Sequence, residues 1–267
     1  MSVDDTDVET RIADAWDRIS SAYQDRYEIS PEHFHYGPMC PDESELGLIG
    51  DVTGLRVLDL GCGGGQNTIW LAERGAEQAL GLDPSASQIG FARKLAESRK
   101  ARAQFAIGDS RACRDMPGQF DLAVSIYALM YAADLRAALT DIHLALAQGG
   151  RLVLALDHPW RIAGAWKGGQ LIVGDYFAEG WDSWDYDFPE QEVSCRLHRV
   201  KRPLDAILTD FLAAGFRLDG MLEPRPPARD DMFARRSKHG ENSPLNVYSR
   251  DKLERVPSTL ILWGSKA

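Results

Sequence analysis

The stretch VLDLGCGGG, residues 57–65, decides the fold. Its apolar part predicts a short buried strand, and the glycines after it predict a tight turn that opens a helix. A turn built from glycine lets a ligand approach the backbone closely. Asp59 stands inside the apolar run, and burial of its carboxylate is tolerated only where N–H groups or a bound cation satisfy it. The stretch therefore predicts a ligand site, with a purely structural carboxylate at Asp59 as the alternative.

Strands and helices alternate around this stretch. Because such alternation requires right-handed crossovers, it predicts a mostly parallel sheet with helices on both faces. We expect strands at 56–60, 78–82, 103–107, 120–125, 150–156, 191–199, 216–223 and 257–264, and helices at 65–74, 85–98, 134–147 and 203–214.

Two segments stand outside this alternation. Apolar residues every three or four positions predict an amphipathic helix over residues 8–27, and we expect residues 1–50 to form a helical lid on a core domain of residues 51–267. An insertion at about 159–190 follows the fifth strand, and eight aromatic residues lie within 160–188. Since aromatic residues dominate both ligand pockets and protein interfaces, this insertion lines an acceptor pocket, a homodimer interface or both.

Composition narrows the class of partner. The 267 residues carry a formal net charge of −10, which disfavours nucleic acid because phosphate backbones are repelled. We expect neither a signal peptide nor a membrane-spanning helix. Four scattered cysteines indicate reduced thiols and therefore a cytoplasmic protein. The basic stretch at 225–238 contains prolines and acids and predicts an exposed loop.

Carboxylates also follow the next two strands. Asp83 ends the second strand, where it is placed to accept hydrogen bonds from both hydroxyls of a ribose, with a helix N-cap as the alternative role. Asp109 ends the third strand, at a place suited to an adenine amino group. The glycine pattern is GxGGG, with Gln66 where a dinucleotide fingerprint has its last glycine, and this weakens the case for a nicotinamide cofactor.

Four segments resemble, in order and spacing, the motifs of class I S-adenosylmethionine-dependent methyltransferases. They are DLGCGGG at 59–65, Asp83, GDS at 108–110 and FD at 120–121, and the match covers about residues 50–160. The resemblance implies an α/β, Rossmann-like fold with a seven-stranded, mostly parallel sheet whose last strand, near residues 258–267, is antiparallel. It also implies S-adenosyl-L-methionine as the cofactor and methyl transfer as the activity.

The resemblance further implies roles for individual residues. The backbone of residues 61–63 would lie beside the methionine part of the cofactor, and Asp59 would lie near its amino group. Asp83 would bind the ribose, Gln88 would lie by the ribose or adenine, and Asp109 would contact adenine. The cofactor residues expected on this basis are Asp59, Gly61, Cys62, Gly63, Asp83, Pro84, Gln88, Gly108, Asp109, Ser110 and Ile126.

Three tyrosines come from segments that are placed to close over the cofactor. Tyr23 and Tyr27 belong to the N-terminal helix, and Tyr36 belongs to the connector that follows it. The face of a tyrosine ring attracts a sulfonium, which adds these three residues to the expected cofactor site. Core packing is the alternative for each of them.

Methyl transfer from a sulfonium requires alignment and exclusion of water more than acid–base groups. An acceptor hydroxyl or protonated amine must still lose a proton, and His158, after the fifth strand, is the first candidate base, with a loop hydrogen-bond donor as its alternative role. His35 and Asp157 are further candidates, and Tyr127 completes the catalytic set. No clustered His and Cys ligands or paired acids predict a metal site.

The sequence thus predicts a methyltransferase acting on a small acceptor, aromatic or heterocyclic, through an O, N or C nucleophile, in secondary metabolism. The fold hosts many functions, so two other classes remain. One is a non-catalytic S-adenosylmethionine-binding protein, and the other is a nicotinamide-dependent oxidoreductase.

Overall fold

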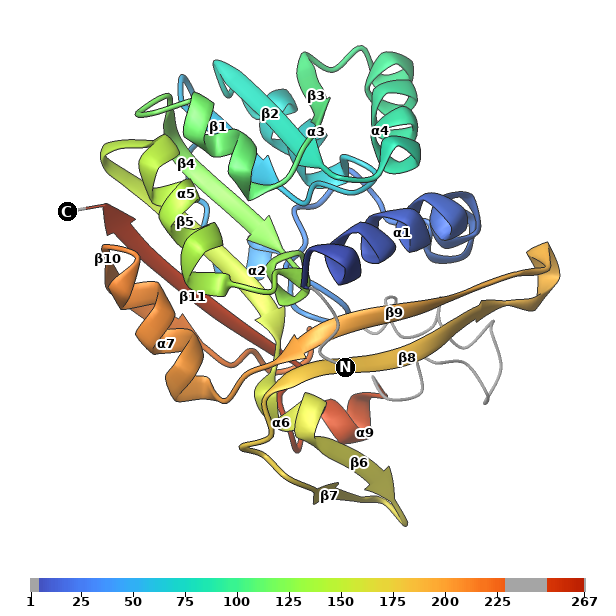
Figure 1. Ribbon diagram of the computed structural model, residues 1–267. Coiled ribbons are helices and arrows are strands. Elements are labelled where there is room, and N and C mark those ends of the chain that lie inside the picture. Colours follow the sequence, from blue (N-terminus) through green and yellow to red (C-terminus); the bar gives the residue numbers. More distant parts are fainter. Residues whose placement is uncertain (1–4, 229–248, 267) are drawn as a thin grey trace.

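The computed structural model describes residues 5–228 and 249–266. Of the predicted exposed loop at 225–238, residues 229–238 lie outside the described part of the chain. A seven-stranded sheet in the order β10-β11-β5-β4-β1-β2-β3 runs through the molecule (Figure 1). The Rossmann-like, mostly parallel sheet that the sequence predicts is therefore confirmed.

Five parallel strands form the body of the sheet. They are β1 (Arg56–Leu60), β2 (Gln78–Asp83), β3 (Ala103–Ile107), β4 (Phe120–Ile126) and β5 (Leu146–Asp157). β1 pairs with β2 and β4, β2 pairs with β3, and β4 pairs with β5, all in parallel. Their carboxyl ends consequently meet at one edge, which is the edge at which open α/β sheets bind ligands.

The sheet ends in an antiparallel pair. β11 (Thr259–Lys266) runs antiparallel to β5 on one side and to β10 (Phe216–Leu222) on the other. The prediction of an antiparallel last strand at the end of the chain is confirmed.

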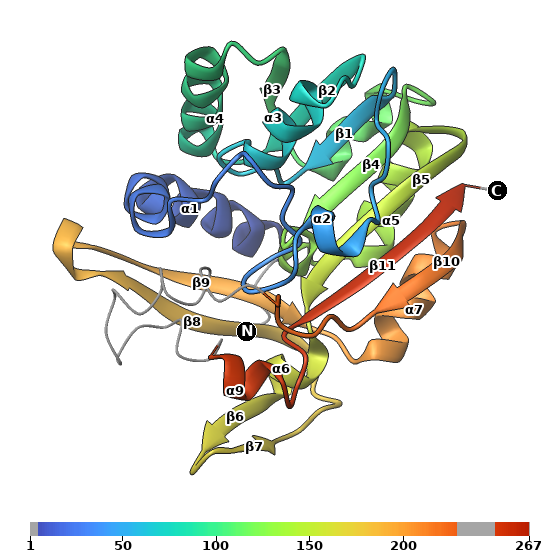
Figure 2. The ribbon, with the colours of Figure 1, turned by 180° about the vertical axis from the view of Figure 1, so that it is seen from behind.

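Helices cover both faces of the sheet. α5 (Leu135–Ala145) and α7 (Leu204–Ala213) pack on one face, whereas α3 (Gln66–Glu73) packs on the other together with the connector after α1 (Figure 2). α4 (Ala86–Arg99) packs beside β2 and β3. The neighbouring residues Val153 and Leu154 of β5 belong to the two different cores, as alternation along a strand requires.

The insertion after β5 folds into two hairpins. α6 (Pro159–Ala163) leads into the β6 (Gly164–Lys167) and β7 (Gln170–Val173) hairpin, which projects from the lower end of the molecule in Figure 1. β8 (Gly180–Phe188) and β9 (Val193–Lys201) form a second, longer hairpin. The predicted strand at 191–199 exists as β9, but it pairs with β8 in a separate two-stranded sheet and not with the main sheet.

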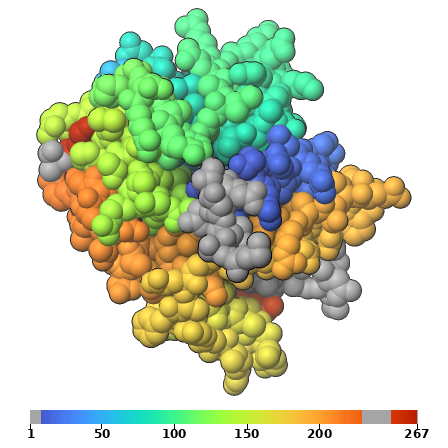
Figure 3. Space-filling model, viewed as in Figure 1, coloured from blue at the N-terminus to red at the C-terminus, as the bar shows by residue number. Residues whose placement is uncertain are grey.

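The N-terminal helix α1 (Asp5–Tyr27) lies between α4 and the β8–β9 hairpin, as the blue surface in Figure 3 shows. Its apolar side chains, among them Ile19, pack with Phe188 and Leu197 of the hairpin. This packing explains why β9 leaves the main sheet, because its apolar face is buried against α1. Within the described ranges, no helix has both the length and the apolar character needed to span a membrane.

Short helical segments complete the described chain. They are α2 (Glu43–Leu46), α9 (Arg250–Leu253) and the 3-10 turns η1 (Ser110–Asp115), η2 (Leu129–Tyr131) and η3 (Pro189–Gln191).

Candidate active site

A cavity of about 1350 Å³ opens at the carboxyl edge of the sheet. It runs from the glycine turn, defined as residues 61–65, past the ends of β2 and β4 to Asp157 at the end of β5. α1, η2 and the β8–β9 hairpin contribute further walls. Every cofactor residue that the sequence predicts lines this cavity except Tyr36, and of the catalytic candidates His35, Tyr127 and Asp157 line it.

Glycine is required in this turn either because the backbone is left-handed or because a neighbouring side chain leaves no room for a Cβ. Gly63 and Gly65 have φ angles of 52° and 79°, a left-handed conformation that favours glycine. A Cβ on Gly64 would lie only 2.4 Å from Gln24 Nε2. A Cβ on Gly63 would meet only Gln88 Oε1, at 4.0 Å, because Gly63 faces the cavity. The bare backbone at Gly63 therefore leaves space that a ligand can fill.

Two buried carboxylates flank the turn. Asp83 Oδ2 accepts a hydrogen bond from the Gly63 N–H at 2.9 Å, and Asp59 Oδ2 accepts one from Thr68 Oγ1 at 2.7 Å. Burial raises the pKa of Asp59 to about 7 and the pKa of Asp83 to about 6. Both carboxylates line the cavity, so a cation or hydroxyl donors placed there would offset the cost of their burial. The N-cap of α4 is Ser85 and not Asp83, and the Ser85 N–H donates to Asp83 Oδ1 at 2.9 Å.

α1 reaches the glycine turn through Gln24. Gln24 Nε2 donates a hydrogen bond to Gln88 Oε1 at 2.9 Å, and Gln24 Oε1 accepts one from Gln66 Nε2 at 2.8 Å. Two turns earlier in α1, Asp17 Oδ1 accepts a hydrogen bond from Ser85 Oγ at 2.6 Å. The helix is thus bonded directly to the start of α3 and the start of α4.

The turn after β3 forms another part of the wall. Gly108, Asp109 and Ser110 line the cavity, and the Arg111 Nε–H donates to Asp109 Oδ2 at 2.9 Å. Burial raises the pKa of Asp109, but hydrogen bonds from Arg111 outweigh burial and hold that pKa below its usual value. Asp109 is therefore an ionised acceptor next to the space predicted for adenine.

Aromatic side chains from three separate segments form what we call the aromatic wall. Trp16 lies with its ring 5.1 Å from that of Tyr23 and 6.2 Å from that of Tyr131, and Tyr23 lies 6.4 Å from Tyr186. Trp184 packs with this cluster, and all five residues line the cavity. The wall offers flat apolar surface to a ligand, as a site for a ring system requires.

Tyr27 also lines the cavity and joins α1 to the hairpin. Its hydroxyl lies 2.5 Å from the Tyr186 hydroxyl, so one of the two donates a hydrogen bond to the other. Burial, together with the neighbouring tyrosine hydroxyls, raises the pKa of Tyr186 well above its usual value. The Tyr186 hydroxyl therefore remains protonated at neutral pH.

His35 is a histidine of the predicted catalytic set that reaches the cavity. Asn67 holds its backbone, because Asn67 Oδ1 accepts from the His35 N–H and Asn67 Nδ2 donates to the His35 carbonyl, both at 3.0 Å. Burial lowers the pKa of His35 to about 4, so its ring is neutral at pH 7. Within the described part of the chain, no residue hydrogen-bonds to the imidazole itself.

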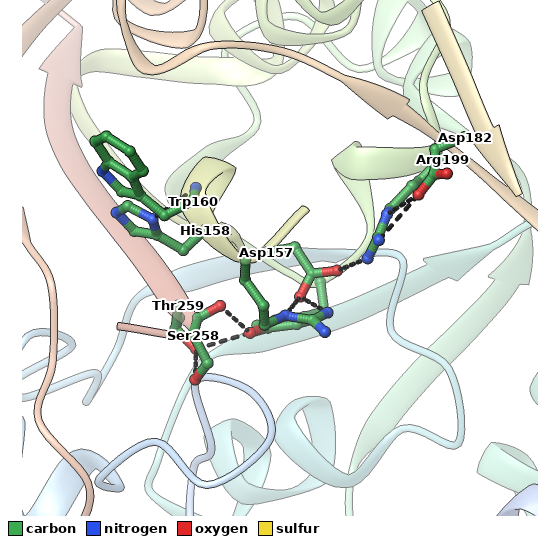
Figure 4. Close-up of polar contacts among 9 residues, drawn as sticks. Asp157, His158, Trp160, Asp182, Arg199, Ser258 and Thr259 are labelled. Carbon is green, nitrogen blue, oxygen red and sulfur yellow. Dashed lines mark hydrogen bonds and ion pairs between the residues drawn. The ribbon is translucent and has the colours of Figure 1, made fainter. Parts of the chain in front are cut away.

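Two predicted site residues lie outside the cavity. His158 is fully buried beside Trp160 (Figure 4), and its Nδ1 accepts a hydrogen bond from the Trp160 N–H at 3.2 Å. Its Nε2 bonds to Glu223 at 2.7 Å. It is the N-cap of α6, so its place fits the alternative role of a loop hydrogen-bonding residue and not that of the base. Tyr36 packs in the core behind α3, and its hydroxyl donates to Glu43. This is the core-packing role that the sequence left as the alternative for Tyr36.

Tyr127 lines the cavity with an unusual backbone. Its φ is 56°, a conformation uncommon for a residue with a side chain and one that clusters at functional sites. Its hydroxyl lies 2.7 Å from Thr259 Oγ1 and donates to the Ser258 carbonyl at 3.2 Å. Because the hydroxyl bonds to the start of β11, we expect Tyr127 to fix the loop after β4 and not to react with an acceptor.

Several lining residues were not singled out by the sequence analysis, although the aromatic insertion that contains Trp184 and Tyr186 was expected to line an acceptor pocket or a dimer interface. Trp184, Tyr186 and Arg199 come from the β8–β9 hairpin, and Gln24 and Asn67 act through amides. The alternation of Trp184, Tyr186 and Phe188 with polar residues is a strand signal that would have found β8. Within residues 5–228 and 249–266, no group of three His, Cys, Asp or Glu side chains is arranged to hold a metal ion.

Comparison with known proteins identifies the family. The model of a methyltransferase domain matches residues 57–150. The solved S-adenosylmethionine dependent methyltransferase from Mesorhizobium loti is 26% identical, with a TM-score of 0.61 over 83% of this chain and 95% of that chain. Residues 57–150 therefore form a methyltransferase domain of the class I S-adenosylmethionine-dependent type. S-adenosylmethionine is therefore the cofactor of this methyltransferase domain.

Curated relatives of the methyltransferase domain share its core. The demethylmenaquinone methyltransferase of Lactococcus lactis is 36% identical over 115 residues, which are 42% of this chain and 46% of that protein. The ubiquinone biosynthesis O-methyltransferase of Pseudomonas aeruginosa is 29% identical over 141 residues, which are 52% of this chain and 56% of that protein. The chain thus spans about half the length of these relatives.

Proposed function

We propose that this chain transfers a methyl group from S-adenosylmethionine to a small-molecule acceptor with an aromatic or heterocyclic ring. The observation that carries the proposal is the cavity of about 1350 Å³, which joins the glycine turn to the aromatic wall. Its volume exceeds the roughly 300–1,000 Å³ of a site for one drug-sized ligand, so a cofactor and an acceptor fit side by side. Two of the relatives are a demethylmenaquinone methyltransferase and a ubiquinone biosynthesis O-methyltransferase, and this supports a small ring-containing acceptor.

The residues around the glycine turn fit the cofactor. The backbone at Gly61, Cys62 and Gly63 would lie beside its methionine part, where a Cβ on Gly63 would otherwise enter the cavity. Asp59 would pair with its ammonium and Asp83 would accept hydrogen bonds from its ribose, and both contacts would satisfy carboxylates whose pKa burial raises. When bound, S-adenosylmethionine supplies an activated methyl group on a positively charged sulfur.

The aromatic wall orients the acceptor and excludes water. Ring stacking against Tyr23 or Trp184 would hold a flat acceptor in one plane, and alignment of this kind is the main catalytic requirement of methyl transfer. The faces of Tyr23 and Tyr27 would also stabilise a nearby cation by about 0.5–2 kcal/mol. Gln88, Asp109 and the neighbouring residues Pro84, Gly108, Ser110 and Ile126 would bind the adenosine part.

His35 is the proposed general base. Its imidazole is neutral at pH 7 and faces the cavity, so a ring nitrogen is able to accept the proton of an acceptor hydroxyl or amine. Asn67 would keep the ring in place through the backbone of His35. A carbon nucleophile in an electron-rich ring would need this base only after attack.

Calorimetry and turnover together test the proposal. Titration of the full chain with S-adenosylmethionine and, separately, with NADH should give binding of the first alone. Incubation with a library of phenols, indoles and amines should then form S-adenosylhomocysteine above the acceptor-free background. Binding of NADH in place of S-adenosylmethionine would favour an oxidoreductase. Cofactor binding without turnover on any acceptor would favour a protein that only binds S-adenosylmethionine.

A further inference from the structure

We propose that the acceptor carries an uncharged oxygen substituent, a hydroxyl or a carbonyl, and that the hydroxyls of Tyr27 and Tyr186 bind this oxygen. We call these two residues the tyrosine pair. The inference rests on the proposed function and names the acceptor class more closely. The tyrosine pair lies where α1 runs along the β8–β9 hairpin (Figure 1), and both of its members line the cavity.

One hydrogen of the tyrosine pair has no acceptor within the described part of the chain. The two hydroxyl oxygens lie 2.5 Å apart, so one hydroxyl donates to the other. Two phenol hydroxyls carry two hydrogens, and a single hydrogen lies between the two oxygens. Among the described residues, neither hydroxyl has a hydrogen-bond partner other than its neighbour in the pair. The hydroxyl that accepts within the pair is therefore able to donate its own hydrogen to a ligand.

The rings of the tyrosine pair are held in place before a ligand enters. The Tyr27 ring lies 4.6 Å from the ring of Tyr23. The Tyr186 ring lies 5.1 Å from the ring of Phe188, which is fully buried. A donor that is already positioned in this way loses little conformational freedom when it binds. A hydroxyl that accepts one hydrogen bond is also a stronger donor in the next, because hydrogen bonds in a chain polarise one another.

The tyrosine pair belongs to the acceptor part of the cavity. Tyr186 comes from β8 and is a member of the aromatic wall, which the proposed function assigns to the acceptor. The carboxylates assigned to the cofactor, Asp59 and Asp83, come instead from β1 and β2 of the main sheet. A hydrogen bond from the pair should therefore reach the acceptor and leave the affinity for the cofactor unchanged.

The charges around the cavity favour an uncharged oxygen over an anionic one. The lining residues include more acids than arginines. Arg161 and Arg199 both donate hydrogen bonds to Asp157. Arg199 also donates to Asp182, so these two arginines leave no excess positive charge for an anion. A neutral hydroxyl or carbonyl oxygen accepts the hydrogen of the tyrosine pair without the cost of bringing a negative charge into an acidic cavity.

The tyrosine pair also links α1 to the hairpin, whether or not it binds a ligand. The two roles make different predictions, because a purely structural link would not distinguish a ligand that carries the oxygen from one that lacks it. Matched pairs of probe ligands measure this difference directly.

The test uses calorimetry on the full chain saturated with S-adenosylhomocysteine. The probe pairs are 4-hydroxyacetophenone with 4-ethylphenol, 5-hydroxyindole with indole, and 2,6-dihydroxynaphthalene with 2-naphthol, so that each pair differs by one oxygen. We expect at least one oxygen-bearing probe to bind about fivefold or more tightly than its partner, as one neutral hydrogen bond allows.

Two variants assign this preference to the tyrosine pair. The double variant Tyr27→Phe with Tyr186→Phe keeps both rings and removes both hydroxyls, and it should reduce the ratio to below twofold. A single variant would leave one hydroxyl with a hydrogen to donate, so the double variant is the decisive one. Tyr176→Phe is the matched control, because the Tyr176 hydroxyl bonds to Leu204 outside the cavity, and it should leave the ratio unchanged.

The outcomes separate this inference from the proposed function. Equal binding within every probe pair, no binding of any oxygen-bearing probe, or a preference that survives in the double variant would overturn the inference. Weaker binding of S-adenosylhomocysteine by the double variant would also overturn it, since the hydroxyls would then serve the cofactor. Failure of the wild-type chain to bind S-adenosylhomocysteine would instead overturn the proposed function.

A further variant covers the case in which the double variant does not fold by circular dichroism. Tyr186→Phe alone removes the neighbour that positions and polarises the Tyr27 hydroxyl, so it should lower the ratio at least twofold. An unchanged ratio in this variant would contradict the inference.

Discussion

The carboxylates of Asp59 and Asp83 are held where burial disfavours their charge. Each accepts a hydrogen bond from a neighbour, and each still has a pKa above its usual value. Groups with this combination of burial and access to a cavity are typical of ligand sites, because the ligand completes their solvation. Both residues are therefore expected to matter more for cofactor binding than for folding.

Asp83→Ala should lower cofactor affinity tenfold or more and leave the fold intact. Hydrogen bonds to a charged group contribute about 1.5–3 kcal/mol each, and the variant loses those from the ribose. Removal of the buried carboxylate ends its desolvation but leaves the Gly63 and Ser85 N–H groups without their acceptor, so the variant should fold with a melting temperature several degrees lower. Calorimetry with S-adenosylmethionine measures the affinity, and Asp115→Ala, at an exposed acid outside the cavity, is the control. Unchanged binding would point to another ribose partner.

His35→Gln should lower kcat by about 10²–10⁴ for hydroxyl or amine acceptors, because a general base contributes on that scale. Cofactor affinity should not change, since the imidazole is not expected to contact the cofactor. His158→Gln is the matched control, and it should reduce stability through the weakened cap of α6 without affecting kcat. If kcat is lost only in the His158 variant, His158 is the general base, as the sequence alone predicts.

At the scale of elements, α1 is part of the cofactor site as well as a cover. Gln24 connects it to Gln66 and Gln88, whose side chains are almost fully buried. A buried amide that loses its partner costs more than the bond contributes, because the remaining group stays desolvated. The position of α1 should therefore affect both stability and cofactor affinity.

Gln24→Leu keeps the size of the side chain and removes both hydrogen bonds. The free energy of unfolding in urea should fall by about 1–3 kcal/mol, the cost of leaving buried amides unpaired. Affinity for S-adenosylhomocysteine should fall at least fivefold, because Gln88 lines the cavity. Ser21→Ala, at an exposed position of α1, controls for changes in the helix. Loss of stability with full affinity would show that α1 only covers the site.

The regular part of the fold was predictable because its elements have strong periodicity. The strands 56–60 and 103–107 match β1 and β3 at both ends, and a glycine follows each of them, at Gly61 and Gly108. The hairpins of the insertion were not predictable as a unit. The β8–β9 hairpin takes its place by packing against α1, more than 150 residues away in sequence, as between Arg26 and Asp187. No local pattern contains that information.

Some residues of the candidate site were likewise predictable from the sequence, and others were not. Asp59, Asp83 and Asp109 follow strands directly, so their meeting at one sheet edge follows from the parallel topology. The choice between His35 and His158 depended on side-chain direction and burial, which spacing does not specify. Arg199 reaches the site only because β9 leaves the main sheet.

At the scale of the whole molecule, buried carboxylates make the folded protein sensitive to pH. The pKa of Asp59 rises from about 3.9 in an unfolded chain to about 7 in the folded one. The folded state therefore binds more protons between these values, and this group makes the free protein less stable as pH rises from about 4 to about 7. A bound ammonium would reverse the effect, because it stabilises the ionised carboxylate.

Cofactor affinity should accordingly rise with pH and level off above about 7. Since a proton must leave Asp59 when the cofactor binds, affinity at pH 6.0 should be roughly tenfold weaker than at pH 8.0. The increase in melting temperature that S-adenosylhomocysteine produces should follow the same trend. In Asp59→Asn the trend should be much reduced, with weaker binding throughout. A pH-independent affinity in the wild-type chain would place the ammonium elsewhere.

The close contact between Gly37 and the Tyr127 ring has a consequence for the evolution of this chain. A Cβ on Gly37 would lie 2.1 Å from the Tyr127 ring, so the connector and the loop after β4 interlock at one point. A side chain at 37 would be strained by the φ of 128° at that position, and it would also require a smaller residue at 127. Homologues that share this cavity should therefore keep Gly37 or change it only together with Tyr127. Covariation of the two positions would help to identify the orthologues of this chain.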